Sequence, residues 1–196
     1  MEVVNHYDLL IEEENDPFRD PPGLQEYMSQ WDGKPFLGAL ELSKYKSVLE
    51  IGIGTGRLAV KVAPFCLRLT GIDISPKTIE RAKHNLKEYS NISFICNDFN
   101  SYEFDETFDV IYSSLTMMHF EDKVAVISKI DKLLNASGIF CLSIDKNQSE
   151  YIDMGTRKVK VYPDNLDYII SIIVKTAISV VKVIETKNAY IIVGKK

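Results

Sequence analysis

A glycine-rich turn, Glu-Ile-Gly-Ile-Gly-Thr-Gly at residues 50–56, constrains the fold of this chain more than any other feature. It follows the short apolar run 48–51, which is typical of a buried strand, and it precedes apolar residues at helical spacing. Strand, glycine turn and helix form the opening of a βαβ unit. Glycine has no Cβ and tolerates positive φ, so the backbone of this turn can pass close to a ligand.

The turn also narrows the kind of ligand. The first N–H groups of the following helix lack partners, and its dipole is positive there, so a carboxylate or phosphate is favoured. The glycine spacing differs from the dinucleotide fingerprint G-x-G-x-x-G, and no G-K-[ST] of a phosphate-binding loop follows. The spacing therefore disfavours a dinucleotide.

Two carboxylates come at the ends of the next two predicted strands. Asp73 ends the strand predicted at 67–74, and Asp98 follows the strand predicted at 92–96. Because the carboxyl ends of parallel strands meet at one edge of a sheet, both side chains are expected to face the same ligand. We interpret Asp73 as a partner of ribose hydroxyls, with helix capping as the alternative. We interpret Asp98, with Phe99 beside it, as a partner of adenine, with a turn aspartate as the alternative.

The rest of the chain continues the alternation of strands and helices. A strand is predicted at 108–114, and residues 113–119 at its carboxyl end are expected to face the reacting group. The elements expected after it are a helix over 124–134 ended by 135–138, a strand at 139–144, a polar segment at 145–160 that closes over the site or extends a sheet edge, a helix from Pro163, and a hairpin of 180–184 with 190–193.

Residues 1–46 precede the first core strand and are predicted to form a helical cap on the domain of residues 47–196. The amphipathic segment 24–31 carries Tyr27 and Trp31 on one face. Two interpretations stay open: this face packs on the domain, or its two aromatic side chains line a lid over the substrate.

The composition is that of one globular unit. At 196 residues, with 45% apolar and 26% charged residues, the chain is long enough for one well-packed α/β domain. The net charge of −5 argues against a nucleic-acid partner, which a basic face usually binds. The three cysteines are far apart in the sequence, which predicts reduced thiols and no metal site. We expect a cytoplasmic protein without membrane contact, because the N-terminus lacks a signal-peptide pattern and the longest apolar stretch is interrupted by lysines.

Several of these segments, in their order and spacing, resemble the motifs of class I (Rossmann-like) S-adenosylmethionine-dependent methyltransferases. They are the glycine motif 50–56, Gly-Ile-Asp-Ile-Ser at 71–75, Asn-Asp-Phe at 97–99, the strand 108–114 and the segment 135–144. The resemblance implies a doubly wound α/β fold: a seven-stranded, mainly parallel sheet with a C-terminal antiparallel hairpin and helices on both faces. It also implies S-adenosylmethionine as cofactor and methylation of a nucleophile.

The resemblance further implies nine cofactor contacts at matching positions. These are Glu50, Gly52, Gly54 and Gly56 around the methionine part, Asp73 at the ribose hydroxyls, Ile74, Asp98 and Phe99 around adenine, and Ser113 near the methionine amino group. His119 is the best-placed candidate for a general base, because an ordinary imidazole titrates near neutral pH. A packing role for His119 is the alternative, and Asp145 is a weaker candidate base.

The acceptor follows by elimination only. The chain lacks a [DN]-P-P-[YF] motif after the fourth strand, a suitably placed cysteine nucleophile and a basic cluster, so a small molecule is favoured over a nucleic acid. The alternatives are a non-catalytic S-adenosylmethionine-binding protein, an RNA methyltransferase and an NAD-dependent oxidoreductase. The sequence predicts neither the methylated atom nor the oligomeric state.

Overall fold

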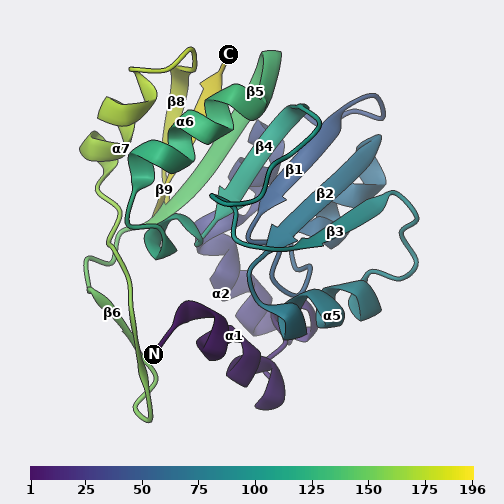
Figure 1. Ribbon diagram of the computed structural model, residues 1–196, viewed down its shortest axis with the longest axis vertical. Helices are drawn as coiled ribbons and strands as arrows, with labels where there is room; N and C mark the ends of the chain where they lie inside the picture. Colours follow the sequence, from purple (N-terminus) through teal and green to yellow (C-terminus); the bar gives the residue numbers. More distant parts are fainter.

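The computed structural model describes residues 1–196, and its centre is a seven-stranded sheet (Figure 1). The strand order is β3-β2-β1-β4-β5-β9-β8, in which β9 is antiparallel to both of its neighbours and the pairs from β3 to β5 are parallel. The strands are β1 (Ser47–Ile51), β2 (Arg68–Asp73), β3 (Ile92–Cys96), β4 (Phe108–Ser114), β5 (Leu134–Asp145), β8 (Ser179–Glu185) and β9 (Ala189–Lys195). The predicted sheet, including its C-terminal antiparallel hairpin, is confirmed.

Helices cover both faces of the sheet, as predicted. On one face lie α3 (Lys34–Ala39), α4 (Ala59–Val62), the 3-10 turn η2 (Ala63–Phe65) and α5 (Pro76–Asn85), and on the other lie α6 (Lys123–Leu133) and α7 (Leu166–Ile173). Strand β1 serves both layers: Val48 packs in one apolar cluster and Leu49 in the other. All five β1 residues are buried, which explains why this strand is a continuous apolar run interrupted only by Glu50.

Two segments differ from the prediction. Residues 145–160 contain a separate two-stranded hairpin, β6 (Tyr151–Asp153) with β7 (Lys158–Lys160), which is not part of the main sheet. Strand β5 begins directly after α6, so the segment 135–138 belongs to the strand. Asn135 donates its side-chain amide to Asp109 at 2.8 Å, which fixes this segment beside β4.

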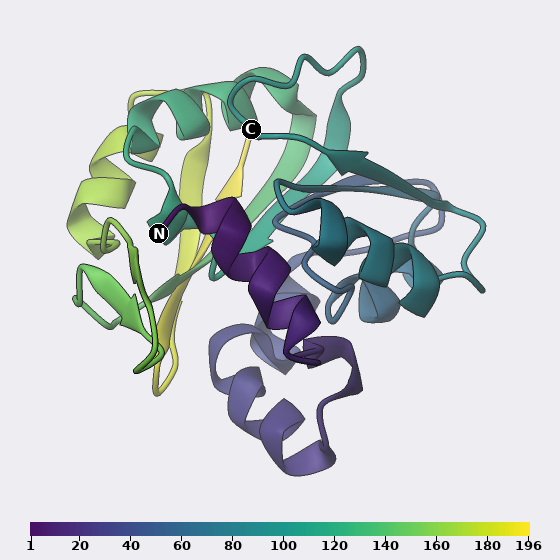
Figure 2. The same cartoon turned by 60° about the horizontal axis from the view of Figure 1, so that its bottom comes forward.

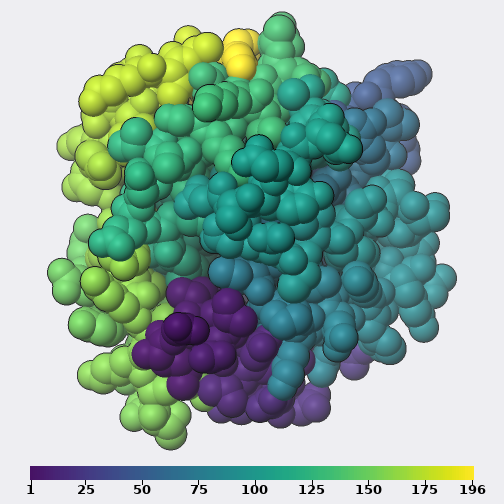
Figure 3. Space-filling view, viewed as in Figure 1, coloured from purple at the N-terminus to yellow at the C-terminus, as the bar shows by residue number.

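The N-terminal 46 residues form α1 (Val3–Glu12), the 3-10 turn η1 (Pro17–Arg19), α2 (Pro22–Asp32) and α3. Of these, α1 lies at the carboxyl ends of the central strands, and α3 packs on one face of the sheet. Turning the molecule brings α1 forward, and it runs across this end of the sheet between the β6–β7 hairpin and α5 (Figure 2). In the space-filling view the same segment fills the lower part of the molecule between these two elements (Figure 3). None of the helices has the length and apolarity needed to cross a bilayer.

Candidate active site at the carboxyl ends of the strands

A cavity of about 280 Å³ lies where the carboxyl ends of β1, β2, β3 and β4 meet α1. This is the switch point of the sheet, because the chain leaves β1 toward β2 on one side while β4 lies on the other. Its lining combines the glycine turn, the strand ends, the 3-10 turn η3 (Met117–His119) after β4, and residues of α1 and α2. The sheet therefore supplies one end of the cavity and the N-terminal helices supply the other.

The three glycines of the turn have different roles. All three have positive φ, at +79° for Gly52, +56° for Gly54 and +97° for Gly56. A Cβ on Gly54 would meet nothing within 4 Å, so the backbone there faces open space in the cavity. A Cβ on Gly52 would lie 2.1 Å from Thr116 Oγ1, although Gly52 still lines the cavity. A Cβ on Gly56 would lie 2.6 Å from Leu86, and Gly56 does not line the cavity.

Asp73 and Ile74 line the cavity at the end of β2, where the sequence predicted them. The Asp73 carboxylate accepts the N–H of Gly54 at 3.0 Å through one oxygen and the N–H of Ser75 at 3.0 Å through the other. These bonds fix the carboxylate against the glycine turn. Burial raises the pKa of Asp73, and the backbone N–H donors oppose that shift.

Asp98 and Phe99 line the cavity at the end of β3, so the structure brings them together with Asp73 as predicted. Asp98 accepts the N–H of Ser101 at 3.0 Å, which is the turn geometry named as its alternative role. Phe99 is 3% exposed and packs against Phe120, with a ring-centroid distance of 6.2 Å. One carboxylate and one aromatic face therefore stand side by side at this end of the cavity.

Glu50 lies beneath the glycine turn and is buried. Its Oε2 accepts the hydroxyl of Tyr112 at 2.7 Å. Burial raises the pKa of Glu50 to about 8, and the Tyr112 hydrogen bond and the charge of Arg57 oppose the shift. Near neutral pH this carboxyl group is therefore largely protonated in the protein alone.

An ion pair that was not predicted joins α2 to the residue after the glycine turn. Arg57 donates to both carboxylate oxygens of Asp32, at 2.8 and 2.5 Å, and Asp32 is 1% exposed. Ser114 donates its hydroxyl to the same carboxylate at 2.6 Å. This bidentate geometry is the strong form of an arginine–carboxylate contact, so α2 is fixed beside the cavity.

Tyr7 and His119 also line the cavity. The Tyr7 hydroxyl lies 2.8 Å from Nε2 of His119, at hydrogen-bond distance, while Nδ1 of His119 is buried and has no partner within the protein. Burial, with the charges of His6 and Lys123, lowers the pKa of His119 to about 4. The imidazole is therefore neutral at pH 7. Burial also raises the pKa of Tyr7, which keeps its phenol protonated.

Four predicted site residues do not line the cavity: Gly56, described above, and Ser113, Tyr27 and Trp31. Ser113 is buried and donates its hydroxyl to the carbonyl of Ile51, because side chains alternate along β4 and the next residue, Ser114, faces the cavity. Tyr27 is half exposed, and Trp31 is buried against the domain, as the packing alternative for this face proposed. The α2 residue that lines the cavity is Met28.

Sequence reasoning missed Tyr7, Asp32 and Arg57. Tyr7 lies in a helix whose apolar residues gave no sign of which side chain faces inward. Asp32 and Arg57 are ordinary surface types in a sequence, and only their pairing in space distinguishes them. Arg57 follows directly after the last glycine of the turn, which is the one signal that was available.

Comparison with known proteins agrees with this geometry. Residues 42–190 match the family described as a methyltransferase domain. Nodulation protein S of Sinorhizobium fredii is 33% identical over 74% of this chain and 69% of that protein. Malonyl-[acyl-carrier protein] O-methyltransferase 1 of Ilyobacter polytropus is 28% identical, over 55% of this chain and 41% of that protein. Among solved structures, the N-methyltransferase NodS of Bradyrhizobium japonicum WM9 in complex with S-adenosyl-L-homocysteine superposes with a TM-score of 0.70, at 24% identity, over 91% of this chain and 90% of that one.

The chain belongs to this methyltransferase family, and it is an S-adenosylmethionine-dependent methyltransferase of class I. The cavity fits the cofactor in two respects. The open space beside Gly54 leaves room for a group that approaches the backbone, and the carboxyl groups of Glu50, Asp73 and Asp98 suit a molecule that carries an ammonium, a sulfonium and ribose hydroxyls. The family match disfavours the oxidoreductase alternative.

Proposed function

We propose that this methyltransferase acts on a small-molecule acceptor, with an amine as the first candidate, which binds between α1 and η3. The observation that carries the proposal is the Tyr7–His119 pair, which lines the cavity and joins α1 to η3. The name of the relative NodS, an N-methyltransferase, supports nitrogen as the methylated atom. The net charge of −5 supports a small acceptor over a nucleic acid.

The cofactor would be held by the residues at the sheet end of the cavity. Glu50, Gly52 and Gly54 would surround its methionine part, and Asp73 would accept hydrogen bonds from the ribose hydroxyls. Ile74, Asp98 and Phe99 would contact adenine. Gly56 would act indirectly, by letting the turn pack against Leu86. Arg57, held by Asp32, is a further candidate for the methionine carboxylate.

The bound cofactor supplies a methyl group that its sulfonium already activates. The protein must therefore orient the acceptor and exclude water, and orientation of this kind contributes on the order of 7–11 kcal/mol. His119 is suited to orient the acceptor. In the tautomer whose Nε2–H donates to the Tyr7 oxygen, the buried and unpartnered Nδ1 carries a lone pair, which would accept the N–H or O–H of an acceptor that displaces the atoms covering it.

The low pKa of His119 refines its predicted role as a general base. A base is most effective when its pKa lies near the working pH, and a pKa of about 4 is well below it. His119 therefore serves chiefly as a neutral hydrogen-bond acceptor that aligns the acceptor's lone pair with the methyl group, and it takes a proton only as the new bond forms.

The segment 1–46 would act as a cover over this site. Asp8 accepts the hydroxyl of Ser75 at 2.6 Å, and Glu12 and Glu13 are paired with Lys77 and Arg157. These contacts tie α1 to α5 on one side and to the β6–β7 hairpin on the other. The ion pairs contribute little each, whereas the buried His6 and the contact of Tyr7 with His119 hold α1 on the domain.

A cytoplasmic location is also proposed, supported by three free cysteines.

An acceptor screen tests the proposal. The protein is incubated with S-adenosylmethionine and a panel of primary amines, alcohols, thiols and carboxylic acids, and release of S-adenosylhomocysteine is measured. We expect turnover with an amine that His119→Ala greatly reduces, whereas Lys132→Ala, a change at an exposed residue of α6, leaves turnover intact. Turnover that requires a folded RNA and not a small molecule would overturn the proposal.

A further inference from the structure

We propose that Lys123 is a positioning residue: together with Asp164 it holds the turn that carries His119 in place at the cavity. This inference rests on the proposed role of His119. Lys123 is the first residue of α6 and contacts neither the cavity nor the cofactor residues, so nothing in the site described above uses it.

Lys123 lies where a lysine is costly. It is 4% exposed, and an ammonium group loses much of its hydration when it is buried. It also stands at the N-terminus of a helix, where the helix dipole disfavours a positive charge. Asp122 already caps this helix by accepting the N–H of Ala125 at 2.9 Å, so Lys123 is not needed to begin it. Because of both costs, we expect the ammonium group of Lys123 to have specific hydrogen-bond and charge partners.

The contacts of Lys123 converge on the His119 turn. Its Nζ donates to the carbonyl of Met117 at 3.0 Å and to that of Phe120 at 3.3 Å, which are the carbonyls on either side of His119. It also donates to the carbonyl of Tyr162 at 2.9 Å, and the N–H of Tyr162 donates to the carbonyl of Met118 at 2.7 Å. One ammonium group therefore joins the turn to the segment that returns from the β6–β7 hairpin.

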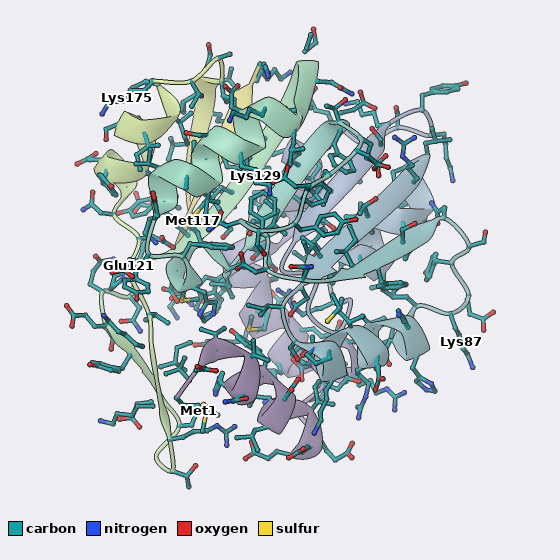
Figure 4. All side chains as sticks on the ribbon, in the orientation of Figure 1. Met1, Lys87, Met117, Glu121, Lys129 and Lys175 are labelled. Carbon is teal, nitrogen blue, oxygen red and sulfur yellow. The ribbon has the colours of Figure 1, made fainter.

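Asp164 completes this arrangement. Its carboxylate lies 2.6 Å from the Lys123 ammonium, and both side chains are almost entirely buried, at 3% and 5% exposure. Figure 4 labels Met117 and Glu121, which flank the segment, in the space below α6 and above α1. The pair contacts the turn through its backbone carbonyls, whereas Tyr7 contacts the ring of His119. The segment 162–164 also contacts the residue that follows Phe120, because the Tyr162 hydroxyl donates to Glu121 at 3.1 Å.

We infer that the contacts of Lys123 fix the position of the His119 imidazole. Tyr7 contacts His119 from α1, His6 lies beside Tyr7, and Lys123 lies behind the turn. With the turn held, the imidazole presents Nε2 to Tyr7, and Nδ1 stays buried without a partner in the protein. Without Lys123, the carbonyls of Met117 and Phe120 lose their shared donor, and the imidazole loses its fixed position relative to Tyr7.

The test is a nitrogen-15 spectrum of labelled histidine, which reports the tautomer and the pKa of each ring. The chain has three histidines, so His119→Ala identifies the His119 signal. We compare the wild type, Lys123→Met and the matched control Lys132→Met on the exposed side of α6. We expect Lys123→Met to lose the single Nε2–H tautomer and to show a pKa of His119 that rises toward its ordinary value, while S-adenosylhomocysteine still binds. Lys132→Met is expected to match the wild type.

If Lys123→Met alone fails to fold, because it leaves the Asp164 carboxylate buried without a partner, the double variant Lys123→Met/Asp164→Leu is used instead. Replacement of both members of a buried ion pair by apolar residues is often tolerated. The His119 signal of the double variant is expected to change in the same way. An unchanged His119 signal in either folded variant overturns the proposal, as would the failure of both variants to fold, which would make the pair a support of the whole domain. These readouts need no acceptor, so they are independent of the acceptor screen.

Discussion

The two ends of the cavity are built by different parts of the chain. At the cofactor end, Asp73 is held by backbone N–H groups of the glycine turn and of Ser75. At the acceptor end, Tyr7 meets His119 through a single side-chain contact between elements 112 residues apart. The first end is a property of the sheet itself. The second depends on the N-terminal helix α1 and on the segments around η3, which can differ while the sheet stays the same.

This difference indicates which part of such a fold would determine specificity for the methyl acceptor. The proposed cofactor positions are ones that any parallel sheet of this order brings together at its switch point. The proposed acceptor positions belong to α1 and η3, which are additions to the sheet. Changes at the two ends should therefore separate cofactor affinity from turnover, and the following predictions test that separation in order of expected size.

The largest effect is expected at the acceptor end. His119→Ala should lower turnover by roughly 10²–10⁴-fold, the usual contribution of a positioned proton acceptor, while cofactor affinity stays close to that of the wild type. Tyr7→Phe should lower turnover less, and the double variant should be little worse than His119→Ala, because the two act as one unit. Steady-state kinetics with calorimetric titration of S-adenosylhomocysteine measure both. Fully additive losses would show that Tyr7 and His119 act independently.

The next effect is expected at the cofactor end. Asp73→Ala should weaken cofactor binding by roughly 1.5–3 kcal/mol, the contribution of hydrogen bonds to a charged group. Calorimetric titration with S-adenosylhomocysteine measures it, and Asp105→Ala, in an exposed loop, is the control. Unchanged affinity in Asp73→Ala would place the ribose elsewhere.

Two glycines of the turn should differ in their effects on cofactor binding and on stability. Gly54→Ala should cost about 1–2 kcal/mol in unfolding free energy, from positive φ alone, and should also weaken cofactor binding, because its Cβ enters the open space. Gly56→Ala should destabilise the fold more, because the new Cβ meets Leu86 as well. Urea unfolding and cofactor titration are compared for the pair. If Gly54→Ala binds the cofactor normally, the cofactor does not approach that backbone.

The smallest effect concerns pH. The pKa of Glu50 in the folded protein, about 8, is above its ordinary value of 4.5, so folding binds a proton, and the stability gained is lost as pH rises toward 8. Between pH 7 and pH 9 the wild type should lose about 1 kcal/mol of unfolding free energy from this group. Glu50→Gln, which keeps an acceptor for Tyr112, should lose less over that interval in urea titrations. Parallel curves for the two proteins would remove Glu50 as the cause.

The comparison also explains which residues the sequence could predict. Asp73, Ile74, Asp98 and Phe99 were predicted because each follows a recognisable strand, and parallel strands fix where their ends lie. Ser113 was predicted to act through its backbone carbonyl and stays a prediction; alternation along β4 turns the side chain of Ser114, and not that of Ser113, to the cavity. Tyr27 and Trp31 were chosen over Met28, because an amphipathic helix reveals its apolar stripe without revealing which part of the protein that stripe contacts.

The sequence by itself indicated the alternation of strands and helices and the carboxylates at the strand ends, because these patterns are local, and its resemblance to a known family implied the seven-stranded sheet. The tertiary structure decided the acceptor end: the meeting of Tyr7 with His119, the pairing of Asp32 with Arg57, and the burial of Lys123 against Asp164. These contacts join residues that are far apart in the chain and have no shared periodicity. Their existence follows from the packing of α1, α2 and the β6–β7 hairpin on the finished sheet, which no local pattern encodes.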